Sequence, residues 1–144
     1  MRVEIRQSPE VQEAYAVIHC NEITDEILRL SSSLEAGENI VTAKDNERIV
    51  VLRPKEIFMV RVENEKTILY CQAKKYLSQK RLYELEQQLG KGFMRISKSA
   101  VINVNEVDYV EASFHGMMAL ILKNGCKEYI SRKYLPEFKR YLGL

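Results

Sequence analysis

The sequence predicts a mainly β fold of the α+β class, built from antiparallel hairpins with a few short helices. From Ile40 onward, short apolar runs alternate with polar turns, a pattern typical of successive strands. Several of these turns carry residue pairs that favour tight hairpins, and the helical patterns are short. With 144 residues and 46% hydrophobic content, the chain can bury one core. We therefore expect a β-rich domain over residues 38–144, preceded by a small acidic extension over residues 1–37.

The extension is predicted to contain a strand and a helix. EAYAVIHC at 13–20 has the alternation of a strand, and MRVEI at 1–5 could pair with it. The next segment, TDEILRLSSSLEAG, predicts a helix that begins after Thr24 and ends at Gly37, since Thr is a good N-cap and two acidic residues follow it. One face of this helix is apolar and carries Ile23, Ile27, Leu30 and Leu34.

Three hairpins are predicted in the main domain. IVTAK and ERIVVL flank a turn at Asp45-Asn46, and EIFMVRV and KTILYCQA flank a turn at residues 63–65. MALILK and CKEYIS flank Asn124-Gly125, a pair that favours a type I′ turn with positive φ at both positions. A turn at residues 115–116 separates VDYVEASF from this pair, so we expect a three-stranded meander over about 107–131.

Two short helices interrupt the β pattern. SQKRLYELEQQLGKG, residues 78–92, has a leucine stripe and ends at Gly90. SRKYLPEFKRYLGL, residues 131–144, has Leu135, Phe138 and Leu142 on one face, with a proline near its start. Both patterns indicate packing elements with one basic, solvated side.

Charge is unevenly distributed along the chain. Residues 1–39 hold three basic and eight acidic residues, a balance of −5, whereas residues 40–144 hold 19 basic and 12 acidic residues, a balance of +7. A basic main domain favours a polyanionic partner. A lysine-rich, solvated surface would give the same totals.

The sequence carries no pattern of catalysis or metal binding. His19 and His115 have no Cys or Asp neighbour at ligand or triad spacing, and LGKGF is not a phosphate-binding loop. We therefore expect no enzyme activity, cofactor, metal or small-molecule substrate. Cys20, Cys71 and Cys126 are widely spaced, so we expect reduced and mostly buried thiols. No apolar run could span a membrane and no signal peptide is visible, which predicts a cytoplasmic protein.

Basic residues gather at three predicted strand connections. Lys66 follows the turn at 63–65, Lys98 lies between two serines in FMRISKSAVIN, and Arg132-Lys133 separate the last strand from the last helix. Long cations beside hydroxyls and turn backbone suit phosphate oxygens and acceptor atoms on base edges. A single such lysine would more often only solubilise its loop. Three loops of the same character favour a nucleic-acid-binding surface.

The run FMRISKSAVINVNEVDYVE, followed by NGCKEYISRKYLPEF, resembles the LytTR DNA-binding domain of bacterial transcription regulators. Upstream, RIVVLRPKEIFMVRVENEKTILYC resembles the first strands of the same domain, so the resemblance covers about residues 38–143. It implies an elongated antiparallel β fold of several sheets, with strand-connecting loops in successive major grooves. It also implies a transcription regulator that binds double-stranded DNA at repeated half-sites, as a homodimer.

The resemblance also assigns roles to individual residues. The base-reading loops of the family fall on Lys66, Lys98, Ser99 and Lys133. The candidates for phosphate contact or for shaping these loops are Lys91, Arg95, Ser97, Ser131 and Arg132. Many family members have histidine where this chain has Ser97; a serine there is expected to cap the turn. Lysine suits O6 and N7 of guanine, so guanines about one helical turn apart are expected in the site.

Many relatives carry a receiver domain ahead of this module, and the short extension cannot hold one. The chain therefore resembles compact LytTR regulators without a receiver, some of which are restrained by a membrane-protein partner. We expect the helix at 24–36 either to make a regulatory or dimer contact or to complete the core of the domain. A second class of function stays open, a β-rich interaction module that binds an acidic protein or RNA; the scarcity of RRM-type aromatic motifs argues against RNA.

Overall fold

The computed structural model describes residues 1–36 and 40–144, which belong to two compact units, Met1–Glu38 and Asn39–Leu144. The predicted boundary between residues 37 and 38 and the predicted helix end at Gly37 lie outside the described residues.

Within residues 1–36, the described part of the first unit, there is one helix, α1 (Asp25–Ala36). It begins where predicted, because Thr24 Oγ1 accepts a hydrogen bond from the Ile27 amide at 3.3 Å. The strands predicted at 13–20 and 1–5 are wrong, since residues 1–24 form no strand. Alternation alone does not make a strand; its backbone N–H and C=O groups also need a paired neighbour.

The second unit contains a seven-stranded sheet and a three-stranded sheet, and every pairing is antiparallel. The larger sheet has the order β2-β1-β5-β4-β3-β7-β6 and consists of β1 (Val41–Asp45), β2 (Arg48–Leu52), β3 (Met59–Glu63), β4 (Lys66–Tyr70), β5 (Lys75–Ser78), β6 (Phe93–Ser97) and β7 (Ala100–Asn103). The smaller sheet has the order β10-β9-β8 and consists of β8 (Val107–Ala112), β9 (Met118–Leu122) and β10 (Lys127–Ile130). The predicted fold class and the predicted meander are confirmed.

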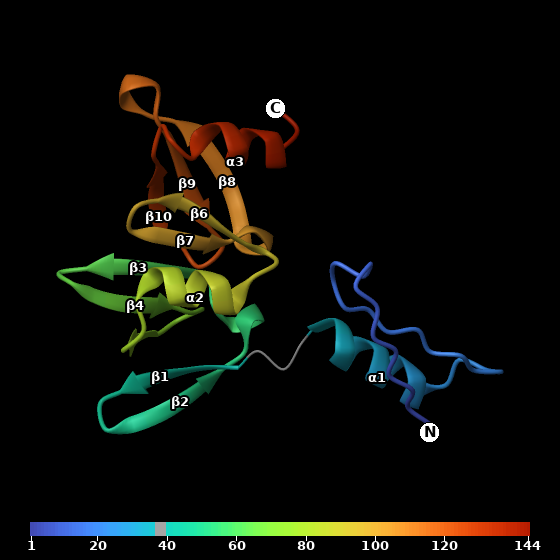
Figure 1. Ribbon diagram of the computed structural model, residues 1–144. Coiled ribbons are helices and arrows are strands. Elements are labelled where there is room, and N and C mark those ends of the chain that lie inside the picture. The colour runs from blue at the N-terminus through green and yellow to red at the C-terminus, as the bar shows by residue number, and fades with distance from the viewer. Residues whose placement is uncertain (37–39) are drawn as a thin grey trace. The chain divides into compact units, whose positions relative to one another are not determined.

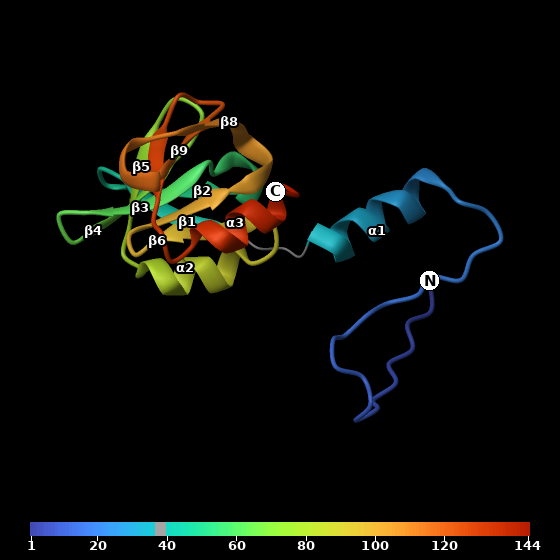
Figure 2. The ribbon, with the colours of Figure 1, turned by 90° about the horizontal axis from the view of Figure 1, so that it is seen from above.

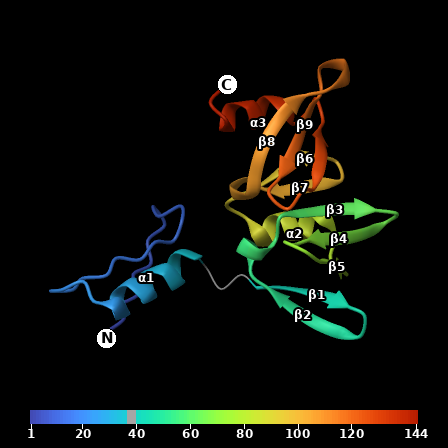
Figure 3. The same cartoon turned by 180° about the vertical axis from the view of Figure 1, so that it is seen from behind.

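Over residues 40–144, two helices and three short 3-10 turns accompany the strands. The helices are α2 (Leu82–Leu89) and α3 (Leu135–Tyr141), and the 3-10 turns are η1 (Pro54–Glu56), η2 (Val104–Glu106) and η3 (Phe114–Gly116). Figures 1 and 3 show the three-stranded sheet with α3 at one end, followed by β6–β7, β3–β4 and β1–β2.

Two hydrophobic cores hold the second unit together. One places the leucines of α2 against strands of the large sheet, including Val60 and Val101, and Figure 2 shows α2 along one side of the strands. The other places Ile102 with Leu120 and Phe138, and so joins the large sheet to β9 and α3. Val101 and Ile102 are neighbours in β7 and enter different cores, because successive strand residues point to opposite faces. Burial on both faces explains why β7 is buried throughout.

Two hairpin turns differ from their predicted forms. The β1–β2 turn lies at residues 46–47, because Asp45 pairs with Arg48 and extends the strand. The type I′ turn predicted at Asn124-Gly125 is wrong, since only Gly125 has a positive φ, 91°. The Asn124 side chain instead accepts a hydrogen bond from the Cys126 amide at 3.0 Å and donates one to the carbonyl of Cys71 at 2.9 Å, which favours a longer loop.

The helices are shorter than predicted, and the thiols are less buried. Gly90, at φ 61°, ends α2 as predicted, but α2 begins only at Leu82, and residues 131–134 form a turn before α3. Cys20 is exposed, and the other two thiols are half-buried, so the expectation of mostly buried cysteines is wrong. Burial, with a smaller contribution from the Glu56 carboxylate, raises the pKa of Cys71 to about 11.

Candidate nucleic-acid interface

Three strand connections lie side by side at one edge of the second unit. They are the β3–β4 turn (residues 64–65), the β6–β7 turn (residues 98–99) and the β10–α3 connection (residues 131–134). The Val62 amide donates to the Ser99 carbonyl at 2.8 Å, and the Ser131 amide donates to the Ile96 carbonyl at 2.9 Å. Figures 1 and 3 show the β3–β4 and β6–β7 turns pointing the same way. The structure thus brings together three loops that are far apart in the sequence.

The β6–β7 turn exposes Lys98 to solvent, while strand residues on either side of the turn are buried. Ile96 and Ala100, on either side of the turn, are fully buried, whereas Lys98 is exposed. Ser97 Oγ accepts a hydrogen bond from the Ser99 amide at 3.2 Å, a serine turn that closes the loop locally. The strand register shifts between Arg95 and Ser97, as in a β-bulge.

Arg95 is bound to the backbone of this turn. Its Nε donates to the Ser97 carbonyl at 2.8 Å and its Nη2 to the Lys98 carbonyl at 2.6 Å. Its Nη1 donates to Glu86 of α2 at 2.7 Å. Three donors of the guanidinium are therefore engaged by the turn and by α2, an arrangement suited to shaping the loop.

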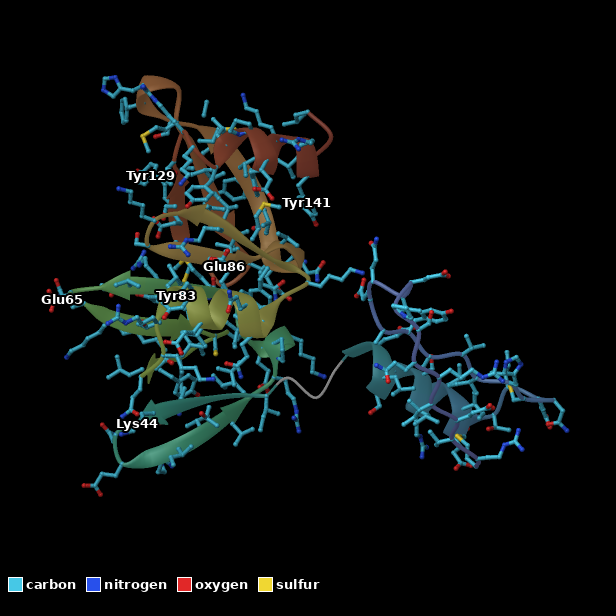
Figure 4. All side chains as sticks on the ribbon, in the orientation of Figure 1. Lys44, Glu65, Tyr83, Glu86, Tyr129 and Tyr141 are labelled. Carbon is cyan, nitrogen blue, oxygen red and sulfur yellow. The ribbon has the colours of Figure 1, made fainter. Side chains whose placement is uncertain are left out.

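The β3–β4 turn is a two-residue hairpin with Lys66 at its edge. Asn64 and Glu65 have φ values of 49° and 66°, the left-handed backbone that a type I′ turn requires. Lys66 is exposed and opens β4 opposite Glu63. Figure 4 shows Glu65 at the tip of this turn.

The β10–α3 connection carries the last pair of cations. The Ser131 carbonyl accepts hydrogen bonds from the amides of Tyr134 and Leu135, both at 3.0 Å, which fixes the turn into α3. Arg132 Nη2 donates to the His115 carbonyl at 2.9 Å. Lys133 is exposed, and its Nζ lies 5.4 Å from the centroid of the Tyr134 ring, within cation–π range.

Lys91 does not join these loops. It is exposed in the turn between α2 and β6, at the opposite end of β6 from Lys98. A strand of this length spans roughly 15 Å at about 3.3 Å per residue. Lys91 therefore belongs to a separate part of the surface.

The sequence reasoning missed a polar network behind the loops. Arg61 donates to Glu128 of β10 at 3.0 Å and to the Tyr70 hydroxyl at 2.9 Å, and it also bonds Glu63. The Tyr70 hydroxyl donates to Glu63 at 2.6 Å. In the sequence these residues are ordinary members of alternating strands, so only the pairing of β3 with β4 and the approach of β10 could have revealed the network.

The network shifts the pKa of its members. Burial acts to lower the pKa of Arg61, but hydrogen bonds to Glu128 and Glu63 outweigh it, and the pKa is raised. The hydrogen bond from Tyr70 lowers the pKa of Glu63, with Arg61 adding to the effect. Burial raises the pKa of Tyr70. All three shifts favour the charged Arg–Glu pair with a neutral tyrosine.

The described residues 1–36 and 40–144 contain no cluster of three or more His, Cys, Asp or Glu side chains that could hold a metal. In the same residues, no helix is both long enough and apolar enough to cross a membrane. The exposed loop cations are instead suited to binding an extended anion.

The second unit is thus an antiparallel β domain with exposed basic loops along one edge. The model of the family described as the LytTr DNA-binding domain matches residues 47–143, and the chain belongs to this family. The resemblance found in the sequence is thereby confirmed.

The chain is similar to curated proteins over nearly their full length. It is 27% identical over 147 residues to an uncharacterised HTH-type transcriptional regulator of Staphylococcus aureus strain MSSA476, covering 100% of this chain and 99% of the relative. It is 29% identical over 135 residues to a protein of the same description from strain NCTC 8325, covering 92% of this chain and 91% of the relative.

A solved structure shares the fold. The LytTr DNA-binding domain of a Bacillus cereus protein described as a methyl-accepting/DNA response regulator aligns with a TM-score of 0.70 at 24% identity. The alignment covers 75% of this chain and 100% of that domain.

Proposed function

We propose that the protein binds double-stranded DNA sequence-specifically and regulates transcription. One observation carries this proposal: backbone hydrogen bonds join the three basic loops into one edge, with Lys66, Lys98 and Lys133 all exposed on it. Family membership and the description of the relatives as transcriptional regulators support it.

In this proposal the loops, not a helix, enter successive major grooves. Lys66, Lys98, Ser99 and Lys133 reach base edges, while Ser131 and Arg132 contact phosphates or hold the last loop. Ser97 and Arg95 shape the central turn, and Lys91 meets a phosphate away from the loops. The helices are poorly suited to groove reading, because α2 buries three leucines and α3 has seven residues with Phe138 buried. Lysine donors favour guanine O6 and N7.

The extension is the proposed regulatory part of the chain. We expect α1 to make a regulatory or dimer contact, because its unit leaves Ile23 and Leu34 exposed, at 71% and 55%. Such a contact would let a homodimer occupy repeated half-sites, or let a membrane-protein regulator restrain the protein in the cytoplasm. Size-exclusion chromatography with light scattering, on the full chain and on an Ile23→Ser/Leu34→Ser variant, tests the dimer.

Binding to selected duplexes tests the proposal as a whole. Duplexes are selected from a random-sequence pool with the full chain, and affinities are measured over a salt series by fluorescence anisotropy. We expect recovery of a common motif and a linear fall of log K with log salt, about −0.9 for each phosphate neutralised. A pool without enrichment, or a flat salt response, would contradict the proposal and favour an acidic protein partner.

A further inference from the structure

Two surface hollows of the second unit lie at opposite ends of the β3–β4 hairpin, and their charges differ. The hollow beside Cys71 is lined by Lys55 and Lys74 together with Glu56 and Glu106, so its charges balance. The hollow beside the β3–β4 turn is lined by four cations and one carboxylate, namely Lys44, Lys66, Lys80, Arg81 and Glu65. Of these two hollows, the second carries the net positive charge.

The four cations of this basic hollow form no ion pair with any of the residues that the structure describes. Six ion pairs occur among residues 1–36 and 40–144, and none of them involves Lys44, Lys66, Lys80 or Arg81. All four side chains are exposed. The Lys80 ammonium donates a hydrogen bond at 2.8 Å to the neutral side-chain amide of Gln88. Cations that repel one another at close range around a concave surface are stabilised when an anion binds there.

Three separate elements build the hollow and continue the loop edge. Lys44 lies in β1, as Figure 4 shows, and its backbone pairs with Leu77 of β5. Lys80 and Arg81 follow β5 and precede α2. Lys66 belongs both to the hollow and to the β3–β4 turn, whose strand β3 is bonded to the β6–β7 turn through Val62 and Ser99. The basic surface therefore extends from the proposed base-reading loops onto β1 and the β5–α2 connection.

We infer that this basic hollow, formed by Lys44, Lys80 and Arg81 beside Lys66, clamps the DNA backbone on the flank of the recognised bases. The inference rests on the proposed function and adds a contact that is independent of sequence. The lining also includes Ser78 and Gln79, whose side chains can donate hydrogen bonds to phosphate oxygens. Since the three cations touch no base in this arrangement, they should contribute equally on every sequence.

Replacement of the three flank cations tests the clamp. In the full chain, Lys44→Gln/Lys80→Gln/Arg81→Gln should lower the affinity for a selected 30-base-pair duplex and for a scrambled duplex by the same factor. The slope of log K against log salt should become shallower by about 2 to 3, at about 0.9 for each phosphate released. Hydroxyl-radical protection should disappear on one flank of the motif and remain over its centre. The matched control is Lys55→Gln/Lys74→Gln/Lys123→Gln, which changes three exposed lysines outside the hollow.

A trimmed duplex separates this inference from the function on which it rests. On a duplex cut back to the motif on the protected flank, wild type and triple variant should bind equally. The clamp is wrong if the triple variant keeps the affinity and salt slope of wild type on the long duplex, or if it loses no more affinity than the control variant does. The proposed DNA binding is unaffected by that result. If wild type itself binds no duplex in a salt-dependent way, the proposed function and the clamp fail together. Unchanged thermal unfolding of both variants ensures that folding does not account for the losses.

Discussion

Arg61 of β3 donates through Nη1 to Glu128 Oε2 of β10 at 3.0 Å and so joins the seven-stranded sheet to the three-stranded sheet. Both side chains are largely buried, at 29% and 16% exposed. β3 leads into the turn before Lys66, and β10 leads into the connection that carries Lys133. This ion pair therefore holds together the two strands that lead into two of the proposed base-reading loops.

Loss of the Arg61 guanidinium should destabilise the protein measurably. Arg61→Leu leaves Glu63 and Glu128 without their cation, and we expect the free energy of unfolding to fall by about 1–3 kcal/mol. Urea denaturation gives this value. Arg48→Leu is the control, because the Arg48 side chain is 77% exposed and its pair with Asp45 should be worth less than about 1 kcal/mol. If the free energy of unfolding fell equally in the two variants, the Arg61 network would not contribute more to stability than an exposed ion pair.

Stability should depend on pH through Glu63 and Tyr70. The pKa of Glu63 is lowered in the fold, so its stabilisation is complete above the ordinary glutamate pKa and is lost as pH falls through the folded-state value. The pKa of Tyr70 is raised, so its stabilisation is complete below the ordinary tyrosine pKa and is lost as pH rises through the folded-state value. Tyr70→Phe should flatten both limbs of the curve of unfolding free energy against pH. Limbs as steep as in wild type would mean that other groups set the pH dependence.

Arg95 should matter for the order of the β6–β7 turn. Arg95→Ala removes the hydrogen bonds to the carbonyls of Ser97 and Lys98, so amide hydrogen exchange at residues 97–99 should accelerate. Affinity for the selected duplex should fall together with loop order. Glu86→Gln retains an acceptor for Arg95 and should leave exchange in the turn nearly unchanged. If amide exchange at residues 97–99 accelerated in Glu86→Gln but not in Arg95→Ala, Glu86 and not Arg95 would be the residue that orders the turn.

Gly125 should be costly to replace. Its φ of 91° is rarely adopted by L residues, and an added Cβ would meet no neighbour within 4 Å, so any loss comes from the backbone alone. We expect Gly125→Ala to lower the free energy of unfolding by about 1 kcal/mol. Lys123→Ala, in the same loop, should have little effect. If Gly125→Ala left the free energy of unfolding unchanged, this loop would be able to relax to an ordinary backbone conformation.

Much of the fold could be predicted because the strands and turns carry local signals. The meander, the Asn64-Glu65 turn and the start of α1 depend on alternation, turn chemistry and an N-cap within a few residues. The strand predicted at 13–20 is wrong because alternation does not reveal whether a partner strand exists. The four residues of β5 pair with β4 and β1, and so short a run shows little of this in the sequence.

The proposed site was less fully predictable. The basic loop residues could be found because each lies in a recognisable break between strands. Their adjacency depends on the hydrogen bonds from Val62 to Ser99 and from Ser131 to Ile96, which link segments far apart in the chain. Lys91 is close to Arg95 in the sequence, which predicts a shared site, but the five residues of β6 separate Lys91 from the turn.

Base reading by Lys98 is the central claim, and a double-mutant cycle between protein and DNA tests it most directly. Each guanine of the selected motif is replaced in turn by 7-deazaguanine, which lacks the N7 acceptor, and affinities are measured for wild type, Lys98→Ala and the control Lys123→Ala. We expect one guanine whose replacement costs wild type and the control about 1–3 kcal/mol and costs the Lys98→Ala variant almost nothing. If every replacement costs all three proteins the same, Lys98 does not read a base through N7 and the account is contradicted at its centre.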